Sequence, residues 1–240
     1  MSRHNKWSKI KEKKGAADAK RGALFSKLAR QITIVAKDKG ADLATNFTLR
    51  LVVDQAKAAS MPKDNIERAI SRGASKGEDG VEISEITYEA IGPGGVAILI
   101  SAVTDNKNRT TPEIKLLLSK NGASFGGMGS VSWQFEKKGV IRIVGDQIKN
   151  HDEFELEMID LGAEDIKDEE GGLTIKTAPE FLQKITEVLE ARGLKLEYSG
   201  IDFVAKNLIF PDEESKAKLE KLYEALDEHD DITGFATNEG

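Results

Sequence analysis

Residues 84–103 read SEITYEAIGPGGVAILISAV, and this stretch decides the fold class. Polar and apolar side chains alternate over 84–91, as in a half-buried strand, while 96–103 is an almost continuous apolar run of strand length. The four residues GPGG at 92–95 lie between these segments and predict a tight hairpin turn with positive φ angles. The chain therefore contains a β-hairpin, and the neighbouring segments decide what packs on it.

The residues that precede the hairpin predict helices. Over 18–39 the apolar side chains recur with a helical period, and basic side chains project to the other side. A second helix is expected over about 43–59, and a third over 60–73, where a proline suits the first turn. The Gly-rich segment 73–80 marks the change from a helical to an extended period. Residues 1–78 are therefore expected to form a small three-helix domain.

The segments that follow the hairpin alternate between helix and strand. A polar loop over 104–109 precedes a helix in which Thr110 and Glu113 have the spacing of a capping box, and 130–135 is expected to be a strand. From 139 to 205 the order is strand, helix, strand, strand, helix, strand. This is the ferredoxin-like arrangement.

The last segments of the chain, a helix over 212–228 and a strand over 232–236, would complete the α+β unit that the hairpin begins. We therefore expect an α+β chain in which an N-terminal three-helix domain precedes two ferredoxin-like α+β domains, the middle one discontinuous. The expected boundaries are 1–78 for the basic helical domain, 79–136 plus 206–240 for the discontinuous α+β domain, and 137–205 for the inserted ferredoxin-like α+β domain.

The net charge of −6 averages two unlike parts of the chain. Residues 1–75 hold 17 Lys and Arg against 7 Asp and Glu, a net of +10, while the remaining 165 residues hold 18 against 34, a net of −16. Such asymmetry indicates a basic region that meets a polyanion. Cations interleaved with an aromatic side chain suit phosphate contacts and stacking, although a solvated arm with Trp7 packed on the helices is the alternative. The expected nucleic-acid-binding residues are Arg3, Lys6, Trp7, Lys9, Lys11, Lys13, Lys14, Lys20, Arg21, Lys27 and Arg30.

Two loops are further candidate sites. The first combines amides, cations and a helix N-terminus, which suits an anion or partner, but its Asp and Asn residues could equally only shape the turn. The second, within GASFGGMG at 122–129, is a candidate flexible partner loop whose apolar residues could instead plug the core. The residues of the first loop are Asp105, Asn106, Lys107, Asn108, Arg109 and Thr110. Those of the second are Phe125, Gly126, Gly127 and Met128.

The composition argues against several classes of function. Zero Cys removes disulfides and thiolate chemistry, and the three His residues have no metal-ligand spacing. The sequence around 92–95 lacks the Lys-Ser/Thr of a P-loop. We therefore expect no enzyme activity, no cofactor and no metal site. No apolar run reaches the length of a membrane span, so a cytoplasmic protein without a membrane partner is expected.

Several short segments, in order along the chain, resemble the motifs of the YebC/PmpR family of probable transcriptional regulatory proteins. They are HNKWSKIK at 4–11, DAKRG at 18–22, FSKLARQI at 25–32, YEAIGPGGVA at 88–97, TDNKNRT at 104–110, GSV at 129–131, Phe135 and KGVI at 138–141. The resemblance implies a non-enzymatic protein with a helical N-terminal domain and two α+β domains.

The same resemblance implies two alternative functions. Members of the family are described as DNA-binding transcriptional regulators, so DNA is the first expected partner. Others, including the mitochondrial translational activator of cytochrome oxidase, are linked to translation, so ribosomal RNA and the ribosome are the alternative partners. No helix shows an obvious base-reading face, and both functions therefore remain open at the level of sequence.

Overall fold

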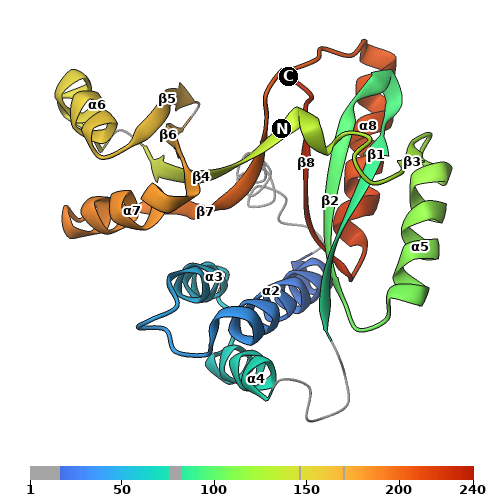
Figure 1. The fold of residues 1–240 in the computed structure, drawn as a ribbon, viewed down its shortest axis with the longest axis horizontal. Coiled ribbons are helices and arrows are strands. Elements are labelled where there is room, and N and C mark those ends of the chain that lie inside the picture. The colour runs from blue at the N-terminus through green and yellow to red at the C-terminus, as the bar shows by residue number, and fades with distance from the viewer. Residues whose placement is uncertain (1–16, 76–82, 146, 170) are drawn as a thin grey trace. The chain divides into compact units, whose positions relative to one another are not determined.

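The computed structural model describes residues 17–75, 83–145, 147–169 and 171–240, with the side chains described from Arg21 onward (Figure 1). The chain divides into two compact units. The first comprises residues up to Phe135 together with Ala205–Gly240, and the second comprises Glu136–Val204. Among the described residues, no helix is both long and apolar enough to cross a membrane.

The described residues of the first unit start with three helices, which confirms the expected helical region: α2 (Ala17–Lys39), α3 (Phe47–Ala58) and α4 (Lys63–Ala74). They share one apolar core that includes Leu28, Ile32, Leu49 and Ile66. The second helix begins at Phe47 rather than near residue 43, because the Asn46 side chain accepts the N–H of Leu49 and caps the helix there.

Gly73 explains how closely α4 approaches α2. A Cβ atom at this position would lie 2.7 Å from the Cβ of Ala36 and would also collide with the carbonyl oxygen of Thr33. A glycine therefore allows the two helix backbones to pack together.

The remainder of the first unit is a four-stranded sheet with the order β3-β1-β2-β8. The strands are β1 (Ser84–Ile91), β2 (Ala97–Thr104), β3 (Ser124–Gly126) and β8 (Ile232–Thr237), and the helices are α5 (Lys107–Lys120) and α8 (Glu213–Glu228). Apolar side chains of both helices and of β1 and β2 form one core. The final strand pairs antiparallel with β2, so the end of the chain returns to the hairpin.

The hairpin turn has the expected backbone. Gly94 and Gly95 have φ values of 68° and 77°, within a short 3₁₀ turn over Pro93–Gly95. Only glycine adopts such angles without strain. The hairpin therefore closes in the register that pairs Ile91 with Ala97.

The expected strand over 130–135 is wrong. Three residues, Ser124–Gly126, pair with β1 instead, and Ser132–Gln134 forms a 3₁₀ turn. The next strand begins only at Phe135. The reason is that the backbone N–H groups of this segment bind the Glu89 carboxylate rather than a neighbouring strand.

The second unit has the ferredoxin-like order of elements. They are β4 (Phe135–Val144), α6 (His151–Asp160), β5 (Ala163–Glu169), β6 (Gly172–Thr177), a 3₁₀ turn (Pro179–Phe181), α7 (Leu182–Ala191) and β7 (Leu196–Ala205). The sheet order β5-β6-β4-β7 is that of a split βαβ fold. Arg142, which is buried on β4, is neutralised by Glu169 at 2.8 Å and Glu197 at 3.0 Å.

These observations confirm the α+β class, with a helical start and two antiparallel sheets. The first sheet follows the order β-β-α-β, and its last helix and strand come after the second unit along the chain. The division into two compact units keeps the helices and the first sheet together. The finer division at 1–78, 79–136 plus 206–240, and 137–205 remains a prediction.

Candidate nucleic-acid interface

Most of the predicted nucleic-acid-binding residues belong to the segment before α2, here called the basic arm, which lies outside the described part of the chain. The residues concerned are Arg3, Lys6, Trp7, Lys9, Lys11, Lys13 and Lys14. Lys20 belongs to α2, but its side chain also lies outside the described residues. Arg21, on the first turns of α2, is exposed. The structure therefore places Arg21, Lys27 and Arg30 from the predicted nucleic-acid-binding set.

Lys27 and Arg30 do not point freely into solvent, in contrast to the expected basic face. The Lys27 ammonium donates to the backbone carbonyl of Asp227, and the Arg30 guanidinium donates to that of Asp230. Gln31, on the same side of α2, donates to the carbonyl of Thr233 at 3.2 Å. These contacts follow the i, i+3, i+4 spacing of one helix face. This face of α2 therefore docks on the turn between α8 and β8.

Asp231 is the centre of this contact. Its carboxylate lies 3.0 Å from Arg30 Nη2 and 2.8 Å from Arg109 Nη2, and it accepts the Thr110 hydroxyl at 2.6 Å. The residue is 2% exposed. Burial alone raises the pKa of Asp231, but the hydrogen bonds from Thr110 and Arg109 and the charge of Arg30 outweigh it and lower that pKa. One carboxylate thus joins α2, α5 and β8.

Two residues of the loop over 105–110 are taken up by a carboxylate of the same chain. Arg109 and Thr110 bind Asp231, as described above. Asn106 caps α5 by accepting the N–H of Arg109 at 3.1 Å, so the expected capping box starting at Thr110 is wrong. The Thr110 hydroxyl is instead buried against Thr104 at 2.7 Å. The other loop residues, Asp105, Lys107 and Asn108, are exposed.

The Gly-rich loop is anchored on both sides. Phe125 and Gly126 lie in β3, paired with β1. Beyond them the Glu89 carboxylate accepts the N–H groups of Gly129 and Val131, both at 2.7 Å, and that of Ser132 at 2.9 Å. Burial raises the pKa of Glu89, and these backbone hydrogen bonds reverse the effect and lower it.

Between these two anchors the loop presents an apolar tip. Gly127 and Met128 lie there, and the Met128 side chain is 103% exposed. Trp133, 66% exposed, follows the loop, and its indole N–H donates to the Ser130 carbonyl at 3.2 Å. The alternative in which Met128 plugs the core is therefore wrong.

Sequence reasoning missed Asp231 and Glu89, because nothing local distinguishes them. Asp231 is one of many acidic residues near the C-terminus, and Glu89 looks like the solvent-facing residue of an alternating strand. Their partners lie far away along the chain: Asp231 binds Thr110, 121 residues before it, and Glu89 binds the N–H of Val131, 42 residues after it. Neither residue was singled out from the sequence, and both side chains are buried anchors.

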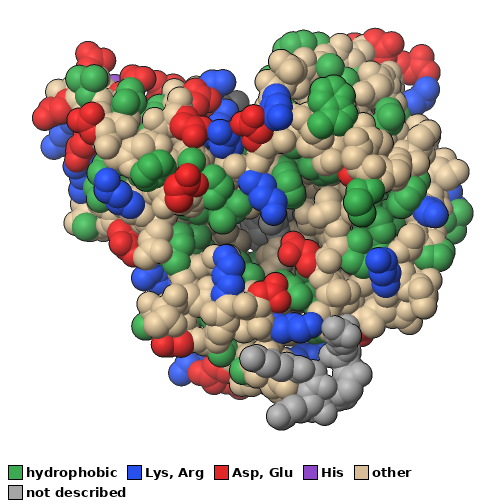
Figure 2. Space-filling view, in the orientation of Figure 1, with side chains coloured by type: hydrophobic (Ala, Val, Ile, Leu, Met, Phe, Trp, Pro, Cys, Tyr) green, Lys and Arg blue, Asp and Glu red, His purple; other side chains and the backbone are tan. Residues whose placement is uncertain are grey.

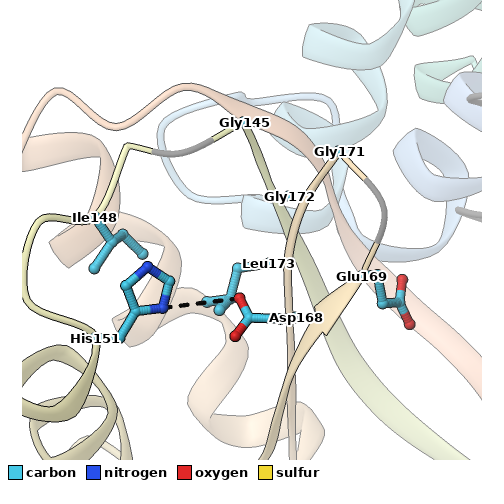
Figure 3. A pocket seen from close by; sticks show the side chains of 8 residues that line it. All are labelled: Gly145, Ile148, His151, Asp168, Glu169, Gly171, Gly172 and Leu173. Atoms are coloured by element: carbon cyan, nitrogen blue, oxygen red, sulfur yellow. Dashed lines mark ion pairs between the residues drawn. The ribbon is translucent and has the colours of Figure 1, made fainter.

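A separate cavity of about 430 Å³ lies in the second unit, between the start of α6 and the β5-β6 turn (Figure 3). Its lining residues are Gly145, Ile148, His151, Asp168, Glu169, Gly171, Gly172 and Leu173. Inside it, His151 Nδ1 faces Asp168 Oδ1 at 3.8 Å, while the Glu169 carboxylate pairs with Arg142. None of the residues expected to bind a ligand lies there, and the described residues contain no group of three or more potential metal ligands.

Two models of protein families match this chain, one its first part and one the rest. Residues 5–76 match the model of the TACO1/YebC protein N-terminal domain, and residues 83–239 match that of the TACO1/YebC second and third domain. A probable transcriptional regulatory protein of Pseudothermotoga lettingae is 45% identical over 238 residues, with 99% of this chain and 93% of the relative covered. One of Thermotoga maritima has the same identity and coverage.

A solved structure agrees with the sequence comparison. The crystal structure of a conserved hypothetical protein from Aquifex aeolicus is 40% identical, covers 98% of this chain and 96% of its own, and superposes with a TM-score of 0.87. Matches to both domain models, together with relatives of this identity over nearly the full length, settle the family. The chain belongs to the TACO1/YebC family.

Proposed function

We propose that this protein is a nucleic-acid-binding regulator, and that it acts as a DNA-binding transcriptional regulator. The observation that carries the proposal is the concentration of positive charge, a net of +10, in residues 1–75 of an otherwise acidic chain. Lys and Arg side chains gain affinity for nucleic acid by neutralising phosphates and releasing counterions. The relatives' description as probable transcriptional regulatory proteins supports the same function.

The internal contacts of α2 limit which residues take part. Lys27 and Arg30 already bind oxygen atoms of the α8–β8 turn, so they are poorly available to phosphate. Arg21 is exposed, and seven residues of the expected set precede the described part of the chain. We therefore assign phosphate binding to the segment before α2 and to Arg21, and a positioning role to Lys27 and Arg30.

A second candidate function, a ribosome-associated translation factor that contacts RNA, is favoured by one observation. One face of α2 packs in the helical core through Leu28 and Ile32, and another docks on the α8–β8 turn through Arg30. A helix held on two sides is poorly suited to enter a major groove and read base edges. Recognition by backbone and shape, as in structured RNA, needs no such helix.

We expect no catalysis and no cofactor to be involved, and this part of the proposal rests on the family resemblance. The two described histidines contact neighbouring residues of their own units. His229 accepts the N–H of Asp231 at 3.2 Å and faces Glu113 at 3.5 Å, and His151 faces Asp168.

Salt dependence of binding tests whether the protein binds nucleic acid through the arm. Labelled duplex DNA and labelled structured RNA are titrated with the full chain between 50 and 200 mM salt. If the arm makes about 6–10 phosphate contacts, affinity falls by roughly 10³–10⁵ over this range. The variant Lys9→Glu plus Lys13→Glu should bind weakly and with a shallower salt dependence. A flat salt response of the wild type would reject the proposal.

Sedimentation separates the two candidate functions. Cell lysate is run through a sucrose gradient and blotted for the wild type, for the arm variant and for a control, Lys184→Glu plus Lys221→Glu, which makes the same charge change at exposed positions of α7 and α8. Co-migration with ribosomes that only the arm variant loses would favour translation. Absence from every ribosomal fraction, together with protection of defined promoter DNA, would favour transcription.

A further inference from the structure

Helix α5 differs in charge from the other helices of the two sheets. It carries Lys107, Arg109, Lys115 and Lys120 against one acidic residue, Glu113, a net of +3. By contrast, α6 has five acidic residues and no Lys or Arg, α7 has two against one Lys, and α8 has six against three Lys. A cationic helix on an acidic part of the chain is the kind of local feature that attracts a polyanion.

The acidic groups near α5 are already occupied. Arg109 faces Asp105 at 3.4 Å and Glu113 at 3.9 Å, and His229 also faces Glu113. Arg109 itself is held by the buried Asp231. These carboxylates thus lie against Arg109, and none of them pairs with Lys107, Lys115 or Lys120 in the described part of the chain.

Three ammonium groups of α5 remain available. Lys107, Lys115 and Lys120 are exposed, and none of them forms an ion pair or a hydrogen bond with the part of the chain that the structure describes. Lys115 Nζ lies 4.7 Å from the centre of the Phe125 ring, a cation–π contact that leaves its positive charge in place. On α2, by contrast, Lys27 and Arg30 both donate hydrogen bonds to backbone carbonyls.

The shape of the helix surface permits a long ligand to approach. The exposed face contains Pro112, Leu116 and Ser119, which are short or apolar, and Lys115 and Lys120 flank them. A 14-residue helix spans about 21 Å, enough to run beside several phosphates of one strand. In Figure 2, green and blue side chains are seen among tan atoms over α5, whereas red, acidic side chains gather over α6.

We propose that the exposed face of α5, through Lys115 and Lys120, binds the phosphodiester backbone of nucleic acid as a contact separate from the N-terminal arm. This inference rests on the proposed nucleic-acid-binding function and extends it to a surface on the first sheet. The charge of the lysines attracts phosphates, which DNA and RNA share. Its effect is added affinity and a fixed orientation of the protein on its target.

The test compares four proteins: wild type, Lys115→Gln plus Lys120→Gln, the arm variant Lys9→Glu plus Lys13→Glu, and the control Lys184→Gln plus Lys221→Gln. The probes are a labelled DNA duplex and a labelled RNA hairpin with a single-stranded loop, titrated by fluorescence anisotropy from 50 to 200 mM salt. Thermal melts of each variant check that the fold is intact; exposed Lys→Gln changes on helices are expected to leave it so.

The α5 variant should lose about tenfold in affinity at the lower salt concentration, and the slope of log affinity against log salt should become shallower by about 1.4–1.8, because two phosphate contacts are removed. The control should match the wild type. A larger loss with one probe than with the other identifies DNA or RNA as the ligand of this face.

The outcomes separate this inference from the proposed function. If the arm variant loses affinity and the α5 variant binds as the control does, the α5 contact is rejected and the proposed function stands. Loss only in the α5 variant supports the α5 contact and rejects the arm. If the wild type binds neither probe, both proposals fail.

Discussion

Two helices of the first unit, α2 and α5, are both rich in basic residues, yet they use their charge differently. On α2, Lys27, Arg30 and Lys37 each donate to an oxygen atom on or beside the first sheet; Lys37 binds the carbonyl of Ile83 at 2.8 Å. On α5, Lys115 and Lys120 have no such partner among the described residues. The comparison teaches that the number of cations in a segment does not give the number available to a ligand.

Removing the anchor of α2 should have the largest effect on stability. We expect Asp231→Ala to lower the free energy of unfolding by about 3 kcal/mol, because three hydrogen-bonded partners lose a buried carboxylate. Urea unfolding measures this change. Asp105→Ala is the matched control, since that carboxylate is exposed and should cost less than about 0.5 kcal/mol. Equal effects of the two substitutions would show that Asp231 is not an anchor.

The packing of α2 against α4 should be the next most sensitive feature. We expect Gly73→Ala to cost about 1–3 kcal/mol, because the new methyl group would collide with Ala36 and with the backbone of α2. In Gly22→Ala, by contrast, the added Cβ meets no atom within 4 Å, and the change should stabilise the helix by about 0.4–1 kcal/mol. Thermal unfolding of both variants checks the opposite signs. A stabilising Gly73→Ala would contradict the close approach of the two helices.

The contribution of Asp231 should depend on pH with a definite sign. Its pKa is lower in the folded protein than the ordinary value of 3.8, so folding favours the ionised form. The stabilisation by the Asp231 carboxylate is fully present above pH 3.8. It is lost as the pH falls through the pKa that Asp231 has in the folded protein. The stability difference between wild type and Asp231→Ala, measured by urea unfolding, should therefore be constant from pH 7 to about 5 and shrink below 3.8. A difference that grows in acid would contradict this assignment.

The smallest expected effect distinguishes the two helices most directly. Lys27→Gln should lower stability by about 0.5–1 kcal/mol, because it weakens the contact with Asp227, whereas Lys115→Gln should change it by less than about 0.5 kcal/mol. In nucleic-acid titrations the ranking should reverse, with Lys115→Gln losing more affinity than Lys27→Gln. If Lys27→Gln had the larger effect on both stability and affinity, the lysines of α2 and α5 would not differ in their availability to nucleic acid.

Much of the fold could be predicted from sequence because it depends on local periodicity. The helical period before residue 73, the alternation over 84–91 and the element order from 139 to 205 all correspond to observed elements. The glycines at 94 and 95 likewise predicted the turn, since positive φ is a property of single residues.

The candidate site was less predictable, because its geometry depends on distant partners. Lys27 and Arg30 were expected to bind nucleic acid, but their partners lie 200 residues away along the chain. The loop over 105–110 stays a predicted anion or partner site, while the contact of Arg109 with Asp231 required the packing of β8 beside β2. The strand expected over 130–135 failed for a similar reason, since Glu89 on β1 takes up its backbone N–H groups.

The sequence by itself determined the elements, the hairpin turn and the concentration of positive charge in residues 1–75, because periodicity, φ preference and side-chain charge are local properties. Only the tertiary structure decided which charges are free. Ion pairing requires oxygen and nitrogen atoms within about 4 Å, and that proximity arises when β8 pairs with β2 and brings Asp231 to Arg30 and Arg109. Lys27 and Arg30 of α2 are thereby bound within the protein, whereas Lys115 and Lys120 of α5 remain exposed.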